Sequence, residues 1–196
     1  MFHDITDVWH KNEHIRHLAF HDPLTDLPNR SLLMERLERQ IALGDREQRS
    51  MAVLFLDLDR FKFVNDNFGH DIGDDLLKSV AQKLQALVRH SDTVARLGGD
   101  EFVIKLNNPA NGEEVAHIAE RIVTVINEPM VFGGKTVQVG TSIGIALYPT
   151  DGETPAELIR NADTALYAAK SSGKNTYRFY SPSMTVQPHG SAAAET

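Results

Sequence analysis

The sequence predicts an α/β fold of the α+β sandwich type, with a mixed central β-sheet flanked by helices. Three observations lead to this class. Residues 51–57 are a continuous apolar run ending in acid, which is typical of a strand buried on both faces. Segments with helical periodicity alternate with short strand-like runs from residue 75 onward. Two Gly-Gly pairs, at 98–99 and 133–134, each separate strand-like runs and predict hairpins.

Each element follows from a local pattern. An N-terminal helix over 2–21 must end before Pro23, because a residue that precedes proline disfavours helical backbone. After a turn-rich connector, Ser31 caps a helix that runs to about residue 43. The order β-α-β-β-α-β-α-β that follows is that of an α/β sandwich. Its expected elements are strand 51–57, helix 75–89, hairpin strands 93–97 and 102–106, helix 113–127, hairpin strands 131–132 and 136–148, helix 155–170 and strand 176–180.

The chain divides into three expected regions. Residues 1–21 are a signalling or linker helix, whose approximate apolar heptad suits pairing with a second helix. Residues 22–180 form one globular domain, which 196 residues with 41% hydrophobic content can support. Residues 181–196 have little core potential and are expected to form a flexible tail.

Composition excludes several classes of protein. Without cysteine there is neither a disulfide framework nor a thiolate metal site. A formal net charge of −7 removes the basic footprint expected for long nucleic acid, whereas a small anionic ligand is compatible if metal ions or local lysines neutralise it. No membrane span or signal peptide is visible. We therefore expect a cytoplasmic domain, and membrane attachment of a longer protein through other segments stays open.

Two acids, Asp100 and Glu101, directly follow the first Gly-Gly pair. Such a hairpin tip is usually only a solvated turn. Asp57, however, ends the buried strand, where ligand sites of α/β proteins tend to lie. If the two strands are neighbours, three carboxylates converge, and a divalent cation such as Mg²⁺ relieves their repulsion. Two such ions can activate an attacking hydroxyl and stabilise a leaving phosphate, while a carboxylate accepts the proton.

The segment 60–74 adds residues suited to phosphate and base recognition. Lys62 can meet a phosphate as a point charge. Asn65 and Asp74 together could recognise guanine, because a carboxylate accepts from its N1–H and exocyclic amine. Adenine lacks that pair of donors, so such a site would select guanine. Taken singly, these residues are an ordinary surface lysine, a helix cap and a turn residue.

Together the motifs resemble those of the GGDEF domain, the diguanylate cyclase family. The resemblance covers about residues 20–180 and implies a palm-like nucleotidyl cyclase architecture for the 22–180 catalytic domain. It implies condensation of two GTP into cyclic dimeric GMP with release of pyrophosphate, by a homodimer whose active sites face each other. The matching segments are the opening signature at 22–30, the metal and guanine segment at 57–74, the motif at 98–102 and the later blocks at 142–146 and 162–175.

The resemblance also implies a role for individual residues. Two Mg²⁺ ions per active site, or Mn²⁺ in their place, would be held by Asp57, the Leu58 carbonyl, Asp100 and Glu101. Asp100 would be the base for the ribose 3′-hydroxyl, and Lys62 would stabilise phosphate charge in the transition state. The substrate-binding set would comprise Phe61, Asn65, His70 and Asp74 around guanine, with Lys170 and Lys174 at the terminal phosphates.

A further part of the resemblance concerns regulation. Arg89 and Asp92 fit the R-x-x-D inhibitory site of the family, which implies binding of the product cyclic di-GMP; an ordinary charge pair at a helix end is the alternative. Residues 2–7 resemble the close of a PAS sensor domain, and residues 180–182 resemble a linker toward an EAL phosphodiesterase domain. We therefore expect the chain to come from a PAS-GGDEF(-EAL) type signalling protein.

Two alternatives to an active cyclase stay open, namely a GTP-binding regulatory module with little or no turnover and an adenylyl-type cyclase or polymerase-like palm.

A row of histidines in the predicted N-terminal helix is not explained by any of these functions. His10, His14, His17 and His21 fall on one face of the N-terminal helix. Their spacing permits metal binding or a pH response. We expect a solvated polar face instead, because no cysteine or acid completes the set.

Overall fold

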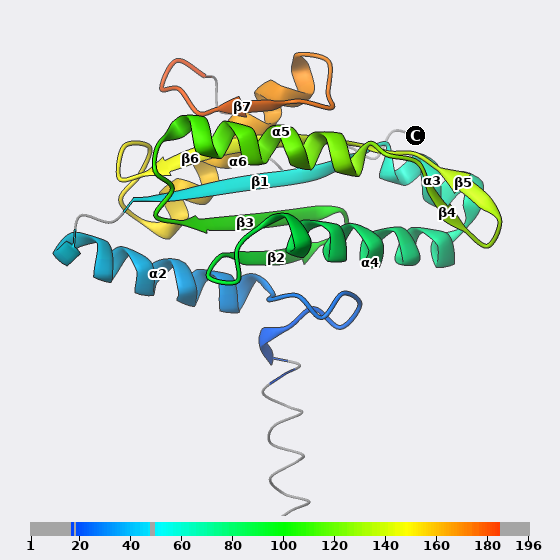
Figure 1. Cartoon of the computed structure of the whole chain (residues 1–196), viewed down its shortest axis with the longest axis horizontal. Helices are drawn as coiled ribbons and strands as arrows, with labels where there is room; N and C mark the ends of the chain where they lie inside the picture. The colour runs from blue at the N-terminus through cyan, green and yellow to red at the C-terminus, as the bar shows by residue number, and fades with distance from the viewer. Residues whose placement is uncertain (1–16, 18, 48–49, 185–196) are drawn as a thin grey trace, which may run out of the picture.

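The protein is built around a five-stranded mixed sheet, which confirms the predicted fold class (Figure 1). The computed structural model describes residues 17, 19–47 and 50–184. Most of the predicted helix 2–21 and of the tail 181–196 lies outside these residues. The strand order is β2-β3-β1-β6-β7, and all pairs are antiparallel except β6 with β7. The strands are β1 (Met51–Asp59), β2 (Thr93–Gly98), β3 (Glu101–Asn107), β6 (Gly140–Tyr148) and β7 (Tyr177–Phe179).

Helices cover both faces of this sheet. α4 (His70–Leu87) and α5 (Gly112–Ile126) pack on one face, and α2 (Arg30–Glu47) and α6 (Pro155–Ser171) pack on the other (Figure 1). The central strand β1 alternates between the two cores: Leu54 and Leu56 join the first, and Val53 and Phe55 join the second. Burial on both faces is why its sequence is continuously apolar.

Local capping explains where two of the helices begin. Asn111 precedes α5, and its side chain accepts a hydrogen bond from the Glu114 amide at 2.9 Å. Thr154 and Glu157 form a reciprocal capping box at the start of α6. Among the described residues, no helix combines the length and the apolar character needed to cross a bilayer.

The structure differs from the sequence-based expectation in three places. Ser31 does not cap its helix, because α2 already begins at Arg30 and the Asn29 side chain accepts from the Leu32 amide at 3.2 Å. Residues 60–74, for which the sequence predicted no helix, form α3 (Phe61–Phe68) and the first turn of α4, joined at Gly69. The predicted strand 136–148 divides in two, because β5 (Lys135–Val137) pairs only with β4 (Met130–Phe132) in a separate two-stranded sheet. The second part of that predicted strand is β6, which pairs with β1 in the main sheet.

Candidate active site

The acidic residues come together because β1 and β3 are neighbours in the sheet. Asp57 stands opposite Glu101 in the antiparallel register, and the Leu58 amide donates to the Asp100 carbonyl at 3.3 Å. On its other side Asp57 stands opposite Ser142 of β6. The backbone therefore places Asp57, Leu58, Asp100 and Glu101 at one end of two adjacent strands, as the sequence predicted.

The Asp100 side chain is partly buried, although it lies at the tip of a hairpin. Burial and the negative charge of Asp57 raise the pKa of Asp100 to about 6, and Glu101 adds to the rise. Lys170 opposes this rise only in part. Burial contributes most to this rise, and the neighbouring carboxylates of Asp57 and Glu101 add crowded negative charge. Such crowding is what a bound cation relieves, and the oxygen donors are those that Mg²⁺ and Mn²⁺ prefer.

Lys170 already contacts this acidic group. Its Nζ lies 3.0 Å from Oδ2 of Asp57, and both side chains are largely buried. The contact follows from the packing of α6 on the face of the sheet toward which Asp57 points. The sequence placed Lys170 near the substrate phosphates but gave no sign of this ion pair.

The second acid at the end of β1 has a different environment. Asp59 is buried, and its carboxylate accepts hydrogen bonds from the Ser142 hydroxyl at 2.9 and 3.1 Å and from the Asn175 amide at 2.9 Å. These bonds tie β1 to β6 and to the loop after α6. Asp59 is therefore a structural residue, and Asp57 is the β1 acid that meets the hairpin.

Arg96 and Asp22 hold the hairpin in place. The Arg96 guanidinium donates to the Gly99 carbonyl at 3.0 and 2.7 Å and to both oxygens of Asp22 at 2.9 Å. Burial acts to raise the pKa of Asp22, but hydrogen bonds from Thr25 and Arg96 outweigh it and hold the pKa below its usual range. The sequence gives no local sign of this pair, because 74 residues separate its members.

The predicted guanine segment forms a helical hairpin with a tight contact at Asn65. A Cβ atom added at Gly73 of α4 would lie 1.9 Å from Asn65 Oδ1 and 3.4 Å from Phe61. Within the described part of the chain, Asn65 Oδ1 is buried without a hydrogen-bond partner. This oxygen faces the Gly73 backbone, so Asn65 is a residue at which α3 packs closely on α4.

The other predicted residues of this segment are exposed. Lys62 lies in the first turn of α3, His70 is the first residue of α4, and Asp74 follows Gly73 on α4. The structure thus brings Phe61 and Asn65 together beside Gly73, and places His70 and Asp74 on the facing helix. Lys62 shares α3 with Phe61 and Asn65, at the end of that helix that follows β1 directly.

Lys174 lies at a separate cavity. This cavity has a volume of about 360 Å³ and is lined by Lys174, Arg60, Asp59 and the backbone around Gly140 and Gly173. Arg60, which the sequence analysis did not select, has a left-handed backbone with φ of 65° directly before α3. Two cationic side chains at the end of β1 make this cavity suited to an anion.

Arg89 and Asp92 lie in one turn but are not joined by their side chains. The Asp92 carboxylate accepts from the Arg89 and Asn107 amides at 2.9 Å each, so it caps the turn before β2. The Arg89 guanidinium instead pairs with Glu114 at 2.6 Å. Both residues line a cavity of about 370 Å³ together with His21, Asp26 and Arg36.

A mixed sheet with acids at the ends of two adjacent antiparallel strands, beside an anion-suited cavity, defines a class: the nucleotidyl cyclase domains of palm-like architecture. Comparison with known proteins gives the family. A model of the family described as "Diguanylate cyclase, GGDEF domain" matches residues 19–176. The chain belongs to the GGDEF family.

Relatives extend this result. The chain is 50% identical over 183 residues to the bifunctional diguanylate cyclase/cyclic di-GMP phosphodiesterase MucR of Pseudomonas aeruginosa, matching 92% of this chain and 26% of that protein. It is 42% identical over 169 residues to the diguanylate cyclase TpbB of the same species, matching 86% of this chain and 39% of that protein. The chain thus spans between a quarter and two fifths of these relatives.

Solved structures show the same fold. The GGDEF domain of TpbB aligns with a TM-score of 0.80 at 42% identity, covering 82% of this chain and 94% of that one. The coiled coil and GGDEF domain of DgcB from Caulobacter crescentus, solved in complex with c-di-GMP, aligns with a TM-score of 0.81 at 26% identity, covering 90% of this chain and 93% of that one.

Proposed function

We propose that this chain is a diguanylate cyclase domain, which condenses two GTP into cyclic di-GMP and releases pyrophosphate. The observation that carries the proposal is the meeting of Asp57 with Asp100 and Glu101 at the ends of adjacent strands. Membership of the GGDEF family and relatives named as diguanylate cyclases support it. We propose the domain boundaries 22–180 for this activity.

The acidic group is proposed to hold two divalent ions, Mg²⁺ or Mn²⁺. Carboxylates of Asp57, Asp100 and Glu101 and the Leu58 carbonyl are the ligands in this proposal. When bound, the ions supply Lewis-acid activation of a hydroxyl and neutralise phosphate charge. Lys170 must then release Asp57, to which it is paired at 3.0 Å, and it becomes available for substrate phosphate.

The proposed reaction joins a ribose 3′-oxygen of one GTP to the α-phosphorus of the other. The bond from that phosphorus to pyrophosphate breaks, and the proton of the hydroxyl passes to Asp100. Before the ions bind, burial and the charge of Asp57 raise the pKa of Asp100 above its usual range, which favours proton uptake by this carboxylate over an exposed aspartate. Lys62 is proposed to stabilise the charge that develops on phosphate. One GTP per domain requires two domains face to face, so we propose a homodimer.

Recognition of guanine is proposed to rest on the helical hairpin of α3 and α4. In this proposal Asn65 hydrogen-bonds the base, Asp74 accepts from the guanine N1–H and amine, and Phe61 and His70 line the pocket. Lys174 is proposed to reach the terminal phosphates from its cavity, and Arg60 lines the same cavity. Adenine would leave these acceptors without the donors that guanine offers, which favours guanine.

One observation favours a second candidate, a GTP-binding regulatory module with little turnover. The ion pair between Lys170 and Asp57 is the contact that must break before Asp57 holds a metal ion. Some relatives of this chain, such as NbdA of Pseudomonas aeruginosa, are named cyclic di-GMP phosphodiesterases. In this second candidate the domain binds GTP and regulates a neighbouring domain.

Incubation of the purified chain with GTP and Mg²⁺ separates these candidates. The cyclase proposal expects cyclic di-GMP and pyrophosphate, with a rate that rises faster than linearly with protein concentration because two domains must meet. GTP binding without product at high protein concentration supports the regulatory module. Equal turnover of ATP and GTP contradicts the guanine assignment to Asn65 and Asp74.

Product regulation and the wider protein complete the proposal. We propose that Arg89 and Asp92 form an inhibitory site for cyclic di-GMP, whose phosphates compete with Glu114 for the Arg89 guanidinium. Arg89→Ala is expected to relieve product inhibition without lowering the initial rate, as measured by progress curves with added product. Unchanged inhibition would mean that Arg89 and Asp92 only end a helix.

We further propose PAS-like and EAL neighbours in a longer bacterial protein, located in the cytoplasm.

A further inference from the structure

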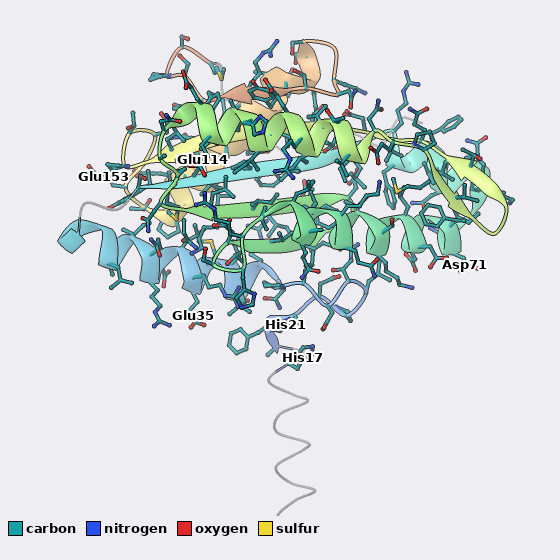
Figure 2. All side chains as sticks on the ribbon, viewed as in Figure 1. His17, His21, Glu35, Asp71, Glu114 and Glu153 are labelled. Atoms are coloured by element: carbon teal, nitrogen blue, oxygen red, sulfur yellow. The ribbon has the colours of Figure 1, made fainter. Side chains whose placement is uncertain are left out.

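Two histidines at the end of the N-terminal helix meet an acid from the turn that follows. His17 and His21 lie side by side below the body of the domain (Figure 2). One donor atom each from His17, His21 and Asp26 lies within 4.8 Å of the others. We propose that these three residues bind a divalent transition metal of the Zn²⁺ class, at a site independent of the acidic group at the strand ends.

The spacing of the donor atoms suits a small ion. His17 Nε2 lies 2.6 Å from Oδ1 of Asp26. Donor atoms around a tetrahedral Zn²⁺ are about 3.4 Å apart, given bonds of about 2.0–2.1 Å. The 2.6 Å separation of His17 Nε2 from Asp26 Oδ1 and the 4.8 Å limit for one nitrogen of His21 bracket this value. Because the His17 and His21 rings stack nearly parallel, one ring must first turn about its side-chain torsions so that both nitrogens point at one ion, which then replaces the hydrogen bond between His17 and Asp26.

The hydrogen bond made by His21 prepares its ring for a metal. His21 Nδ1 lies 3.0 Å from the Asp26 carbonyl oxygen. A carbonyl can only accept, so Nδ1 carries the proton and Nε2 of the neutral ring keeps a free lone pair. Histidines that bind metals usually donate their second ring N–H to a carbonyl or carboxylate in this way, which fixes the tautomer and the ring orientation.

The backbone holds the three residues in place. The His21 amide donates to the His17 carbonyl at 2.9 Å, so the two rings sit one helical turn apart and stack at 4.2 Å with an angle of 13°. The Asp26 amide donates to the Asp22 carbonyl at 2.9 Å, within a turn where Asp26 has a φ of 61°. The expectation that no acid completes the histidine set was wrong, because Asp26 comes from the turn outside the helix. His10 and His14 lie outside the described residues.

The donor set separates this site from the acidic group. Two imidazoles and one carboxylate favour Zn²⁺, Cu²⁺ or Ni²⁺, whereas the oxygen-only set of Asp57, Asp100 and Glu101 favours Mg²⁺ or Mn²⁺. Solvent reaches the proposed site, because the side chains of His17 and Asp26 are 48% and 78% exposed. Metal can therefore enter without a change in the core.

Such an ion would tie the segment that enters the domain to the turn that follows it. His17 and His21 come from this entering segment, where His21 forms a β-bridge with Pro28, and Asp26 belongs to the turn whose Asp22 holds Arg96 at 2.9 Å. Arg96 in turn holds the Gly99 carbonyl of the acidic hairpin at 2.7 Å. The proposed metal thus lies at the junction through which a movement of the entering segment would reach the hairpin.

The test is titration of the full 196-residue chain with Zn²⁺ by calorimetry, in excess Mg²⁺ to occupy oxygen-only sites, with Co²⁺ absorption as a second readout. Wild-type protein is expected to bind one Zn²⁺ and to give the visible bands of a nitrogen-ligated Co²⁺ site. His17→Ala, His21→Ala and Asp26→Asn should each weaken Zn²⁺ binding by at least about tenfold, because even the loss of a residue that only orients a ligand costs that much. Asparagine is chosen because it tolerates the positive φ of Asp26.

Two controls keep the outcome decisive. His90→Ala removes an exposed histidine that lines the adjacent cavity, and the double variant His10→Ala with His14→Ala removes the rest of the helical face. Both should bind Zn²⁺ within about twofold of wild type. Unchanged binding in the His17, His21 and Asp26 variants, or loss of binding in the double variant, overturns the proposal. Asp100→Ala should leave Zn²⁺ binding intact, so failure of this proposal is separate from failure of the cyclase assignment.

Discussion

Two hairpins of this chain each turn at a Gly-Gly pair, but their surroundings differ strongly. Gly98–Gly99 joins β2 to β3 in the main sheet, and Gly133–Gly134 joins β4 to β5 in a separate two-stranded sheet. Gly99 and Gly133 have nearly equal positive φ angles, 50° and 55°. In the second hairpin Val131 is 67% exposed, whereas β3 in the first is buried along most of its length.

The same type of turn therefore stands in two different settings. What distinguishes the first hairpin is its neighbours: β1 brings Asp57 to one side, and Arg96 fixes the tip to Asp22. The second hairpin has Lys135 where the first has Asp100, and β5 has no strand beyond it among the described residues. Substitutions matched between the two hairpins therefore isolate what the surroundings add.

The largest expected effect comes from the residue that follows each Gly-Gly pair. Asp100→Ala should lower the rate of cyclic di-GMP formation by at least about 100-fold, because it removes the proposed base and a metal ligand. Lys135→Ala in the second hairpin should keep the rate within about twofold. The rates are compared with GTP and Mg²⁺ at equal protein concentration. Activity retained in Asp100→Ala would contradict the assignment of both roles.

The next effect concerns the support that only the first hairpin has. Arg96→Ala leaves Asp22 without its main partner in a site where both side chains are at most 14% exposed. We expect a loss of about 2–3 kcal/mol in the free energy of unfolding in urea, somewhat below the range for fully buried pairs. Turnover should fall about tenfold because the Gly99 carbonyl is released. Arg96→Lys is the control, since it keeps the positive charge and loses the planar guanidinium that bonds two partners at once. Equal stability of wild type, Arg96→Ala and Arg96→Lys would refute the role of Arg96 in holding the hairpin.

A smaller effect compares the two turns directly. Gly99→Ala and Gly133→Ala place a Cβ in open space, with no atom within 4 Å, so each meets only the strain of a positive φ. Both should lose about 1 kcal/mol of stability. Only Gly99→Ala should also lower turnover, measured at a temperature where both variants are fully folded. Equal turnover of the two variants at that temperature would contradict the expectation.

The smallest effect is a pH-dependent change in stability. The pKa of Asp100 is about 6 in the folded protein and 3.8 for an unperturbed aspartate, so the folded state binds more protons between these values. Ionised Asp100 therefore destabilises the fold above about pH 6, and this effect disappears as the pH falls toward 4. Asp100→Asn should be more stable than wild type by about 1 kcal/mol at pH 7.5, after allowance for solvent screening, and equal at pH 4.

Unfolding in urea at the two pH values measures this difference. Asp75→Asn serves as control, because Asp75 is an exposed acid on α4 that pairs only with Lys78 at 3.5 Å among the contacts of the described chain. A stabilisation in Asp100→Asn that does not vary with pH would show that crowded charge is not its cause.

Much of the fold could be predicted because its signals are local. The apolar run of β1, the periodicity of α5 and the capping of α6 all appear within single segments, and the structure has each of them. The convergence of Asp57 with Asp100 needed one further assumption, that β1 and β3 are neighbours. The antiparallel register of the two strands confirms it.

The remainder depends on contacts between distant segments. α3 was missed because Asn65, Asp66 and Asn67 are poor helix formers, and its helical state rests on the packing of Val64 and Phe61 on the core. Asp59 is structural because Ser142 and Asn175, which belong to other elements, donate hydrogen bonds to its carboxylate. Neither partner lies next to the two acids in the sequence, so the difference between Asp57 and Asp59 could not be predicted. The ion pair of Lys170 with Asp57 likewise depends on how α6 packs against the sheet.

The turn that carries Asp22 and Asp26 also has a consequence for solubility. β2 is an edge strand, and the Arg96 amide on that edge donates to the Pro28 carbonyl at 3.0 Å. Proline accepts a hydrogen bond but has no N–H to offer, so the sheet cannot grow by another strand at this residue. The segment that leads into the domain thus also closes part of an open sheet edge, and protects the protein there from edge-to-edge aggregation.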